Sequence, residues 1–216
     1  MSSRRLLLGL LVLAIVTAAV LLLKPEWWRE EQANPEFSAY LSVQEPREAL
    51  LDNFRSYDSE QQITQLLAAA DLRVTAERVH VEGTRKYPPY KLDTLTVADY
   101  GHLGHQGTLI LDFFNDRLAS ATFRPVNPKA YLRQVQKTGI SFRREDLSRW
   151  AQQTGNQRIT TNIIFATSHV GSTLNTPPYV SWEDTRLTAQ SRQWYDVYGS
   201  RYAIAPIRAL GPGSDP

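Results

Sequence analysis

The longest apolar stretch of the chain lies near its amino terminus. Residues Leu6 to Leu23 form a run of 18 residues without a charged side chain. Crossing a hydrocarbon core of about 30 Å takes roughly 20 apolar residues, and Arg5 and Lys24 flank the run, so it predicts one transmembrane helix. A cleaved secretory signal with its site at residues 17–19 is the alternative. Apolar residues continue beyond that site, which favours an uncleaved signal anchor.

The flanks of this run predict its orientation. Arg4 and Arg5 precede it, and Trp27 and Trp28 follow it at a position suited to the outer interface. The positive-inside rule then leaves the amino terminus in the cytoplasm. We expect a single-pass protein of the inner (plasma) membrane with an extracytoplasmic, periplasmic C-terminal domain. Residues 1–24 are the predicted anchor, and the polar, proline-interrupted residues 25–45 are a predicted spacer.

Residues 46–138 are predicted to form a first α+β unit. Apolar residues between positions 63 and 70 recur with the i, i+3, i+4, i+7 spacing of an amphipathic helix, which Asp58 or Ser59 can cap. A short helix is expected before it, over residues 49–54. The hydrophobic period then changes to two, which is typical of strands. Strands are predicted over residues 74–81, 92–100, 108–114 and 117–123, with a tight turn at Asn115-Asp116 and a further helix before Gly139.

Residues 139–207 are predicted to form a second α+β unit. The expected elements are a helix over residues 144–154 and strands over residues 159–166, 179–188 and 192–198. Pro-Pro-Tyr occurs at residues 88–90 and again at residues 177–179, an offset of 89 residues that leaves open a tandem duplication. Residues 208–216 are a predicted disordered tail. The predicted fold class is therefore α+β, with a helix-plus-antiparallel-meander unit behind the transmembrane helix.

Two segments of the first unit resemble a known group of envelope domains. Residues Asp58 to Leu67 and Thr108 to Leu118 resemble the small bacterial SmpA/OmlA (BamE-like) domains and the beta-lactamase-inhibitor-protein-like fold. The resemblance covers at most residues 56–125, with an echo in residues 144–199. It implies a helical layer on an antiparallel sheet that serves protein–protein contact. The chain lacks the lipidated cysteine of those lipoproteins, so their outer-membrane location and assembly-machine membership do not carry over.

Composition removes several classes of chemistry and of partner. The chain has no cysteine, which excludes disulfides, thiolate metal sites and cysteine nucleophiles. Its net charge of +2 includes Arg4, Arg5 and Lys24 of the predicted anchor, so 21 basic and 22 acidic residues remain elsewhere. No sustained basic patch is evident in this balance. We therefore expect neither nucleic acid nor an anionic lipid surface as a partner.

Catalytic and metal-binding motifs are weak. His102 and His105, with Asp99 nearby, are the best metal candidates, but an i, i+3 pair in a glycine-containing loop is more often a polar turn. Ser168 and His169 are adjacent, so their side chains would point to opposite faces of a strand and could not form a dyad. No nucleophile elbow or phosphate-binding glycine loop is present. We expect no metal, no cofactor, no catalytic residue and no enzymatic activity.

Aromatic residues carry the prediction of a binding surface, because tryptophan and tyrosine combine an apolar body with a polar tip. The predicted partner-binding residues are Tyr87, Tyr90, Tyr100, Tyr179 and Trp182. We expect Trp182 to be exposed and Trp194 to be buried. The predicted function is a membrane-anchored periplasmic protein-binding accessory or assembly subunit of an envelope complex. A module that binds peptidoglycan or another small polar ligand is the alternative, and a hydrolase is the third reading.

The strand over residues 108–114 is apolar on both faces. Leu109, Leu111 and Phe113 alternate on one side and are expected to face the core. Ile110 and Phe114 lie on the other side, which is unusually apolar for a solvated sheet face. Either the second unit or a partner protein is expected to cover that side.

Overall fold

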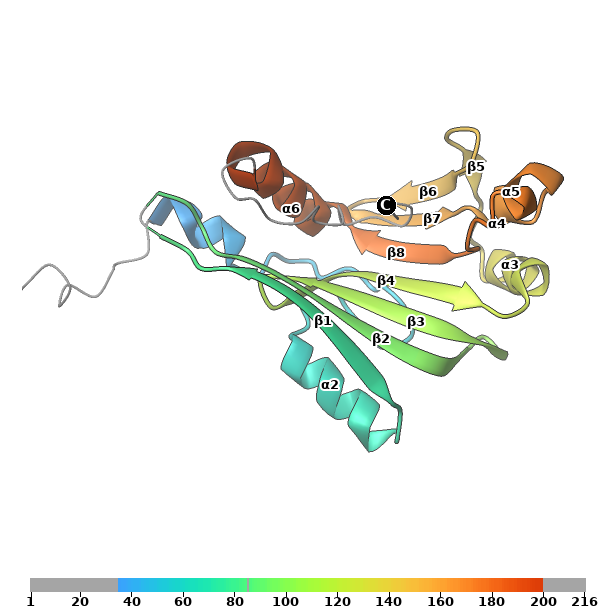
Figure 1. Ribbon diagram of the computed structural model, residues 1–216, viewed down its shortest axis with the longest axis horizontal. Coiled ribbons are helices and arrows are strands. Elements are labelled where there is room, and N and C mark those ends of the chain that lie inside the picture. Colours follow the sequence, from blue (N-terminus) through green and yellow to red (C-terminus); the bar gives the residue numbers. More distant parts are fainter. Residues whose placement is uncertain (1–34, 85, 200–216) are drawn as a thin grey trace, which may run out of the picture.

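The computed structural model describes residues 35–84 and 86–199, which form one eight-stranded antiparallel sheet with helices around it (Figure 1). The strand order is β1-β2-β3-β4-β8-β7-β6-β5. The strands are β1 (Val74–Val81), β2 (Tyr90–His102), β3 (His105–Phe114), β4 (Arg117–Pro125), β5 (Arg143–Arg144), β6 (Trp150–Thr154), β7 (Gln157–Thr161) and β8 (Val180–Asp184). The helices are the 3-10 helix η2 (Pro35–Tyr40) and the α-helices α2 (Glu60–Ala69), α3 (Pro128–Lys137), α4 (Ile163–Ala166), α5 (His169–Thr173) and α6 (Thr185–Tyr198).

Helix α2 and the β1–β4 meander confirm the elements predicted for them. Ser59 caps α2: its hydroxyl accepts from the backbone N–H of Gln62, whose side chain accepts from the N–H of Ser59. Asn115 and Asp116 have φ angles of 48° and 61°, as a two-residue hairpin turn of type I′ requires. Leu66 differs from its prediction, because it is 58% exposed rather than buried.

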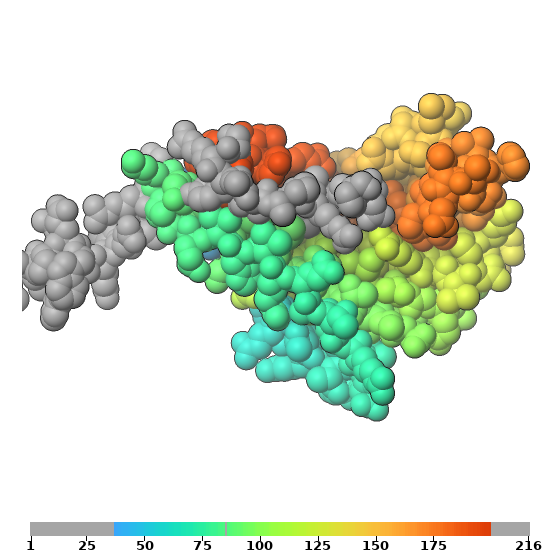
Figure 2. Space-filling model, viewed as in Figure 1, coloured from blue at the N-terminus to red at the C-terminus, as the bar shows by residue number. Residues whose placement is uncertain are grey.

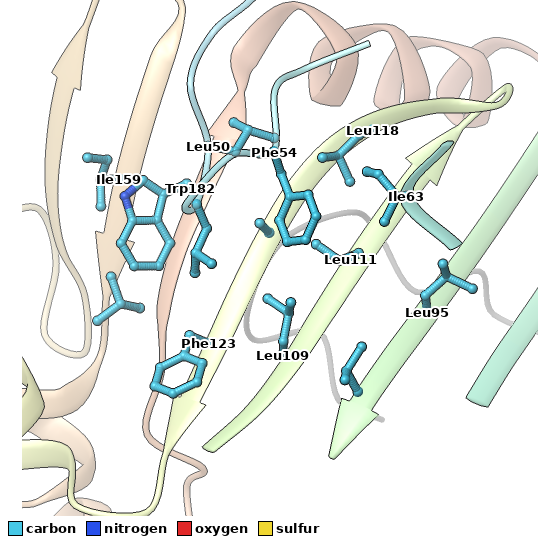
Figure 3. Close-up of a cluster of buried hydrophobic side chains, with 14 of the residues drawn as sticks. Leu50, Phe54, Ile63, Leu95, Leu109, Leu111, Leu118, Phe123, Ile159 and Trp182 are labelled. Atoms are coloured by element: carbon cyan, nitrogen blue, oxygen red, sulfur yellow. The ribbon is translucent and has the colours of Figure 1, made fainter. Parts of the chain in front are cut away.

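The main hydrophobic core lies on one face of the sheet and includes both halves of the chain. Leu109 and Leu111 of β3 pack against Phe54 from the loop before α2 (Figure 3). Trp182 of β8 and Ile159 of β7 lie side by side in the same cluster. Residues before α2 and residues after position 139 therefore share one core.

The opposite face of the sheet is covered at one end by α6. Phe114 of β3 packs there with Tyr90, Leu187 and Trp194, all of them buried. The indole Nε1 of Trp194 donates to the backbone carbonyl oxygen of Pro88 at 2.8 Å. Of the two expected ways to cover the apolar back of β3, the structure thus shows packing by the C-terminal part of the same chain.

The helix predicted over residues 144–154 is wrong. This segment forms the β5–β6 hairpin, and Leu147, which the helix would have buried, is 79% exposed. Asp146 explains the difference, because its carboxylate accepts from the backbone N–H groups of Ser148 and Arg149 at 2.8 Å each. Such local side-chain-to-backbone bonds close a turn in competition with a helix.

Four further predictions of local structure are corrected. The predicted strand over residues 192–198 lies inside α6, which Asp184 begins by accepting from the N–H of Arg186. The predicted strands over residues 159–166 and 179–188 end early, because α4 and α6 begin within them. The short helix at residues 49–54 is a turn segment closed by a bridge between Ala49 and Arg55.

The tandem duplication is also wrong. An offset of 89 residues places α2 onto the β6–β7 hairpin, which contains no helix. All eight strands belong to one sheet instead. The fold class is therefore corrected to a mainly antiparallel eight-stranded sheet with few helices.

The membrane predictions are corrected as well. Among residues 35–84 and 86–199, no helix is long and apolar enough to cross a membrane. This finding stands against the predicted transmembrane helix, the signal anchor and the single-pass inner-membrane, periplasmic location, which are not retained. The run Leu6 to Leu23, residues 25–34 of the predicted spacer and the tail at residues 208–216 lie outside the described residues.

Candidate functional site

Several of the predicted site residues meet around His102, at the end of β2. Its Nδ1 lies 2.6 Å from the hydroxyl oxygen of Tyr131 in α3, and its Nε2 lies 3.5 Å from Oδ1 of Asp52. The Tyr100 hydroxyl donates to Oδ2 of the same Asp52 at 2.7 Å. A neutral His102 with its proton on Nε2 therefore accepts from Tyr131 and faces the Asp52 carboxylate, so both ring nitrogens have partners.

His102 is buried among aromatic side chains. Its ring lies 5.7 Å from the ring of Phe123, 5.7 Å from that of Tyr131 and 5.6 Å from that of Trp182, centroid to centroid. Burial lowers the pKa of His102, and the Asp52 carboxylate opposes this with a smaller effect. Burial also raises the pKa of the Tyr131 phenol. The cluster links β2, α3, β8 and the loop before α2. It therefore stabilises the packing of these elements against one another.

The structure places the weak metal candidates His102, His105 and Asp99 in the β2–β3 hairpin. The two histidines are cross-strand partners in the β2–β3 hairpin, and the ring of His105 lies 5.7 Å from that of Tyr131. Asp99 is exposed at the irregularity in β2, with a φ of 55°. In the part of the chain that the structure describes, no three His, Asp or Glu side chains are grouped so as to hold a metal ion.

Lowering the pH from about 7.5 to about 5 is expected to destabilise the protein through His102. The pKa of His102 is lowered by burial from the value of about 6.5 of an unfolded histidine. The unfolded chain then takes up a proton at a higher pH than the folded chain. The stability contributed by neutral His102 is present above pH ~6.5 and is lost as the pH falls towards the folded pKa, with a slope of at most about 1.4 kcal/mol per pH unit.

Urea unfolding at a series of pH values measures this effect in the wild type and in His102→Gln. The control is His169→Gln, which changes an exposed histidine of α5. The stability difference between wild type and His102→Gln should shrink as the pH falls, whereas the control should follow the wild type. Parallel pH curves for the wild type and His102→Gln would contradict the role of His102.

Three of the five predicted partner-binding residues are buried. Tyr90, Tyr179 and Trp182 are buried, with exposed fractions of 1%, 6% and 5%. The prediction that Trp182 is exposed is therefore wrong, because its indole completes the main core. Tyr87 and Tyr100 are half-buried, and Tyr100 is bonded to Asp52. The burial predicted for Trp194 is confirmed, since none of its side chain is exposed.

The structure offers a different surface, the edge of the sheet formed by β1. This strand pairs with β2 from Val74 to Val81 without a register shift, and no other strand of the described residues pairs with it. Residues 75–78 are all exposed. This part of β1 lies beside α2 on the face of the molecule turned toward the viewer (Figure 2). The outer backbone N–H and C=O groups of an edge strand can pair with another extended chain. The opposite edge, β5, has two residues.

An ionic network fixes β1 to its neighbours. Arg78 contacts Glu60 of α2 at 2.6 Å, and its Nε lies 3.7 Å from the buried carboxylate of Asp93 in β2. His80 Nε2 lies 2.6 Å from the same Asp93 oxygen. These contacts tie β1 to both α2 and β2. An edge strand held in place in this way loses little conformational freedom when a partner strand pairs with it.

The sequence-based interpretation missed Asp52 and Tyr131 as partners of His102. Asp52 has a φ of 51° in the turn before α2, and an Asp-Asn pair at such a position signals a turn but not its distant contact. Tyr131 carries an ordinary helix-core signal. The contacts of both residues arise from the sheet topology, for which the chain gives no local signal.

Comparisons with known proteins identify no family: no family model matches the chain, and no curated protein matches it significantly. The resemblance to SmpA/OmlA domains therefore stays a prediction.

Proposed function

We propose that the protein is a non-catalytic protein-binding module, an accessory or assembly subunit that accepts an extended segment of a partner along β1. The observation that carries this proposal is the eight-residue edge strand, which pairs with β2 without a bulge and exposes residues 75–78. Backbone pairing with such an edge supplies affinity, and alternate side chains supply selectivity.

The charges of β1 favour a different protein over a second copy of this chain. Two copies paired antiparallel about a two-fold axis place either Glu77 opposite Glu77 or Arg78 opposite Arg78 in the registers of greatest overlap. Like charges directly opposite each other destabilise a strand pair. A partner strand with a neutral or basic residue opposite Glu77 avoids this repulsion, so we infer a heteromeric contact.

A photo-crosslinking amino acid placed at Thr75 or Glu77 tests the proposal in cells that produce the protein. Both positions are exposed on β1. We expect each to give one discrete protein adduct on illumination. The matched control is Leu147, which is 79% exposed in the β5–β6 loop and should not give that adduct. The same adduct from Leu147, or none from either β1 position, would overturn the proposal.

A further inference from the structure

Charge is divided unevenly along the chain. Residues 35–116 contain 13 acidic and 7 basic residues, a net charge of −6, whereas residues 117–182 contain 2 acidic and 9 basic residues, a net charge of +7. From Arg117 to Arg144 there is no acidic residue. The small net charge of the whole chain conceals this division.

Three of these basic residues line the outer side of α3. Lys129, Arg133 and Lys137 recur at every fourth position and are all exposed. Successive members are about 6 Å apart along the helix axis and turned by about 40°, so they form one stripe. Tyr131 and Val135, on the other side of α3, are fully buried. The stripe consequently faces solvent at the end of the molecule where α3, α4 and α5 lie (Figure 1).

Lys137 lies in the last turn of α3, where a positive charge suits the helix dipole, but ion pairs do not hold the stripe in place. In residues 35–84 and 86–199, no salt bridge joins Lys129, Arg133 or Lys137 to a carboxylate, and α3 itself contains no acid. Some arginines elsewhere are paired, such as Arg158 with Glu183 at 2.9 Å and Arg186 with Asp184 at 2.6 Å. Like charges four residues apart destabilise a helix. The stripe is therefore available to an anionic partner.

We propose that the α3 stripe, Lys129, Arg133 and Lys137, binds an acidic segment of a protein. Its spacing of about 6 Å is close to the ~6.7 Å between alternate residues of an extended chain, so acidic residues at i, i+2 and i+4 meet the three cations in turn. The aromatic residue of α3, Tyr131, is buried and cannot stack on a base, which favours a protein over a single-stranded nucleic acid. This surface is separate from β1 and does not depend on it.

Fluorescence anisotropy of the full chain tests this surface. The probe is a labelled synthetic peptide with Glu at every second position, and its counterpart has Gln in place of Glu. We expect the Glu peptide to bind, and to bind more weakly as NaCl rises from about 50 mM to about 200 mM. The triple variant Lys129→Gln, Arg133→Gln, Lys137→Gln should lose about tenfold in affinity, as three exposed ion pairs imply. Its melting temperature should equal or exceed that of the wild type, because like-charge repulsion is removed.

The matched control removes three exposed positive charges elsewhere, with Arg55→Gln, Arg73→Gln and Lys91→Gln. It should stay within about twofold of the wild-type affinity. Equal losses of affinity in both triple variants would show that binding depends on net charge alone, which would overturn the proposal. A stripe variant that binds the Glu peptide as tightly as the wild type would also overturn it. Tighter stripe-dependent binding of an oligonucleotide, or of phosphatidylserine vesicles, would overturn it in favour of those partners. Absence of the photo-crosslinked adduct at β1 would overturn the proposed binding along β1. It would leave the proposal for the α3 stripe unaffected.

Discussion

Replacing Trp182 with alanine is expected to lower the free energy of unfolding by about 3 to 5 kcal/mol. Trp182 is 5% exposed, lies in β8 between β4 and β7, and pairs with Ala121 and Ile159. Its indole also meets the His102 ring edge-on at 5.6 Å. Truncation removes the largest side chain of this part of the core, and the surrounding strands cannot close over the space.

Urea denaturation monitored by circular dichroism measures the loss at Trp182. Tyr195→Ala is the control, because Tyr195 is 45% exposed on α6 and its truncation should cost about 0.5 kcal/mol or less. A Trp182→Ala protein as stable as this control would show that Trp182 is a surface residue, contrary to the packing described above.

Trp194→Ala is expected to destabilise the protein by a similar amount, about 3 to 5 kcal/mol. None of the Trp194 side chain is exposed, and its ring centroid lies 4.5 Å from that of Tyr90. The indole also donates to the carbonyl oxygen of Pro88 at 2.8 Å, which joins α6 to the loop between β1 and β2. The substitution therefore removes both packing and a hydrogen bond.

Trp194→Phe separates the two contributions. The phenyl ring keeps most of the contact with Tyr90 but cannot donate to Pro88, so its cost should be smaller, about 1 to 3 kcal/mol. Both variants are compared by urea unfolding at pH 7.5. Wild-type stability of Trp194→Ala would contradict the docking of α6 on the sheet.

The first half of the fold was predictable because its signals are local. The Ser59 cap with Gln62 marks the start of α2, and the Asn115-Asp116 turn fixes the β3–β4 hairpin. Alternating apolar residues supply the strands between these points. Each of these signals depends on neighbours within a few positions, so it can be recognised before the tertiary structure is known.

The second half of the fold was not predictable, because its hydrophobic patterns are compatible with either a helix or a strand. Residues 144–154 show helical spacing, but the carboxylate of Asp146 closes a turn and places Leu147 in solvent. Residues 192–198 alternate like a strand yet continue α6, because Trp194 docks on Tyr90 far away in the sequence. In both segments, contacts outside the local pattern decide the outcome.

Of the two candidate binding surfaces, one could have been predicted from the sequence and the other could not. The basic stripe of α3 could have been read from the sequence, because Lys129, Arg133 and Lys137 recur at every fourth position of a correctly predicted helix. Averaging charge over the chain hid it. The role of β1 as an edge strand could not be read, because strand order depends on how β8 returns to pair with β4.

Two adjacent proline substitutions, Thr75→Pro and Ala76→Pro, test the β1 edge most directly. The N–H groups of consecutive strand residues point to opposite sides, so one proline interrupts pairing with β2 while the other removes an outward donor only, as edge strands tolerate. The melting temperature distinguishes the two proline variants, because only the one that interrupts pairing with β2 should be strongly destabilised. With the crosslinker at Glu77, we predict that the variant with near-wild-type melting temperature loses most of the partner adduct. Full adduct yield from that variant would contradict partner binding along β1.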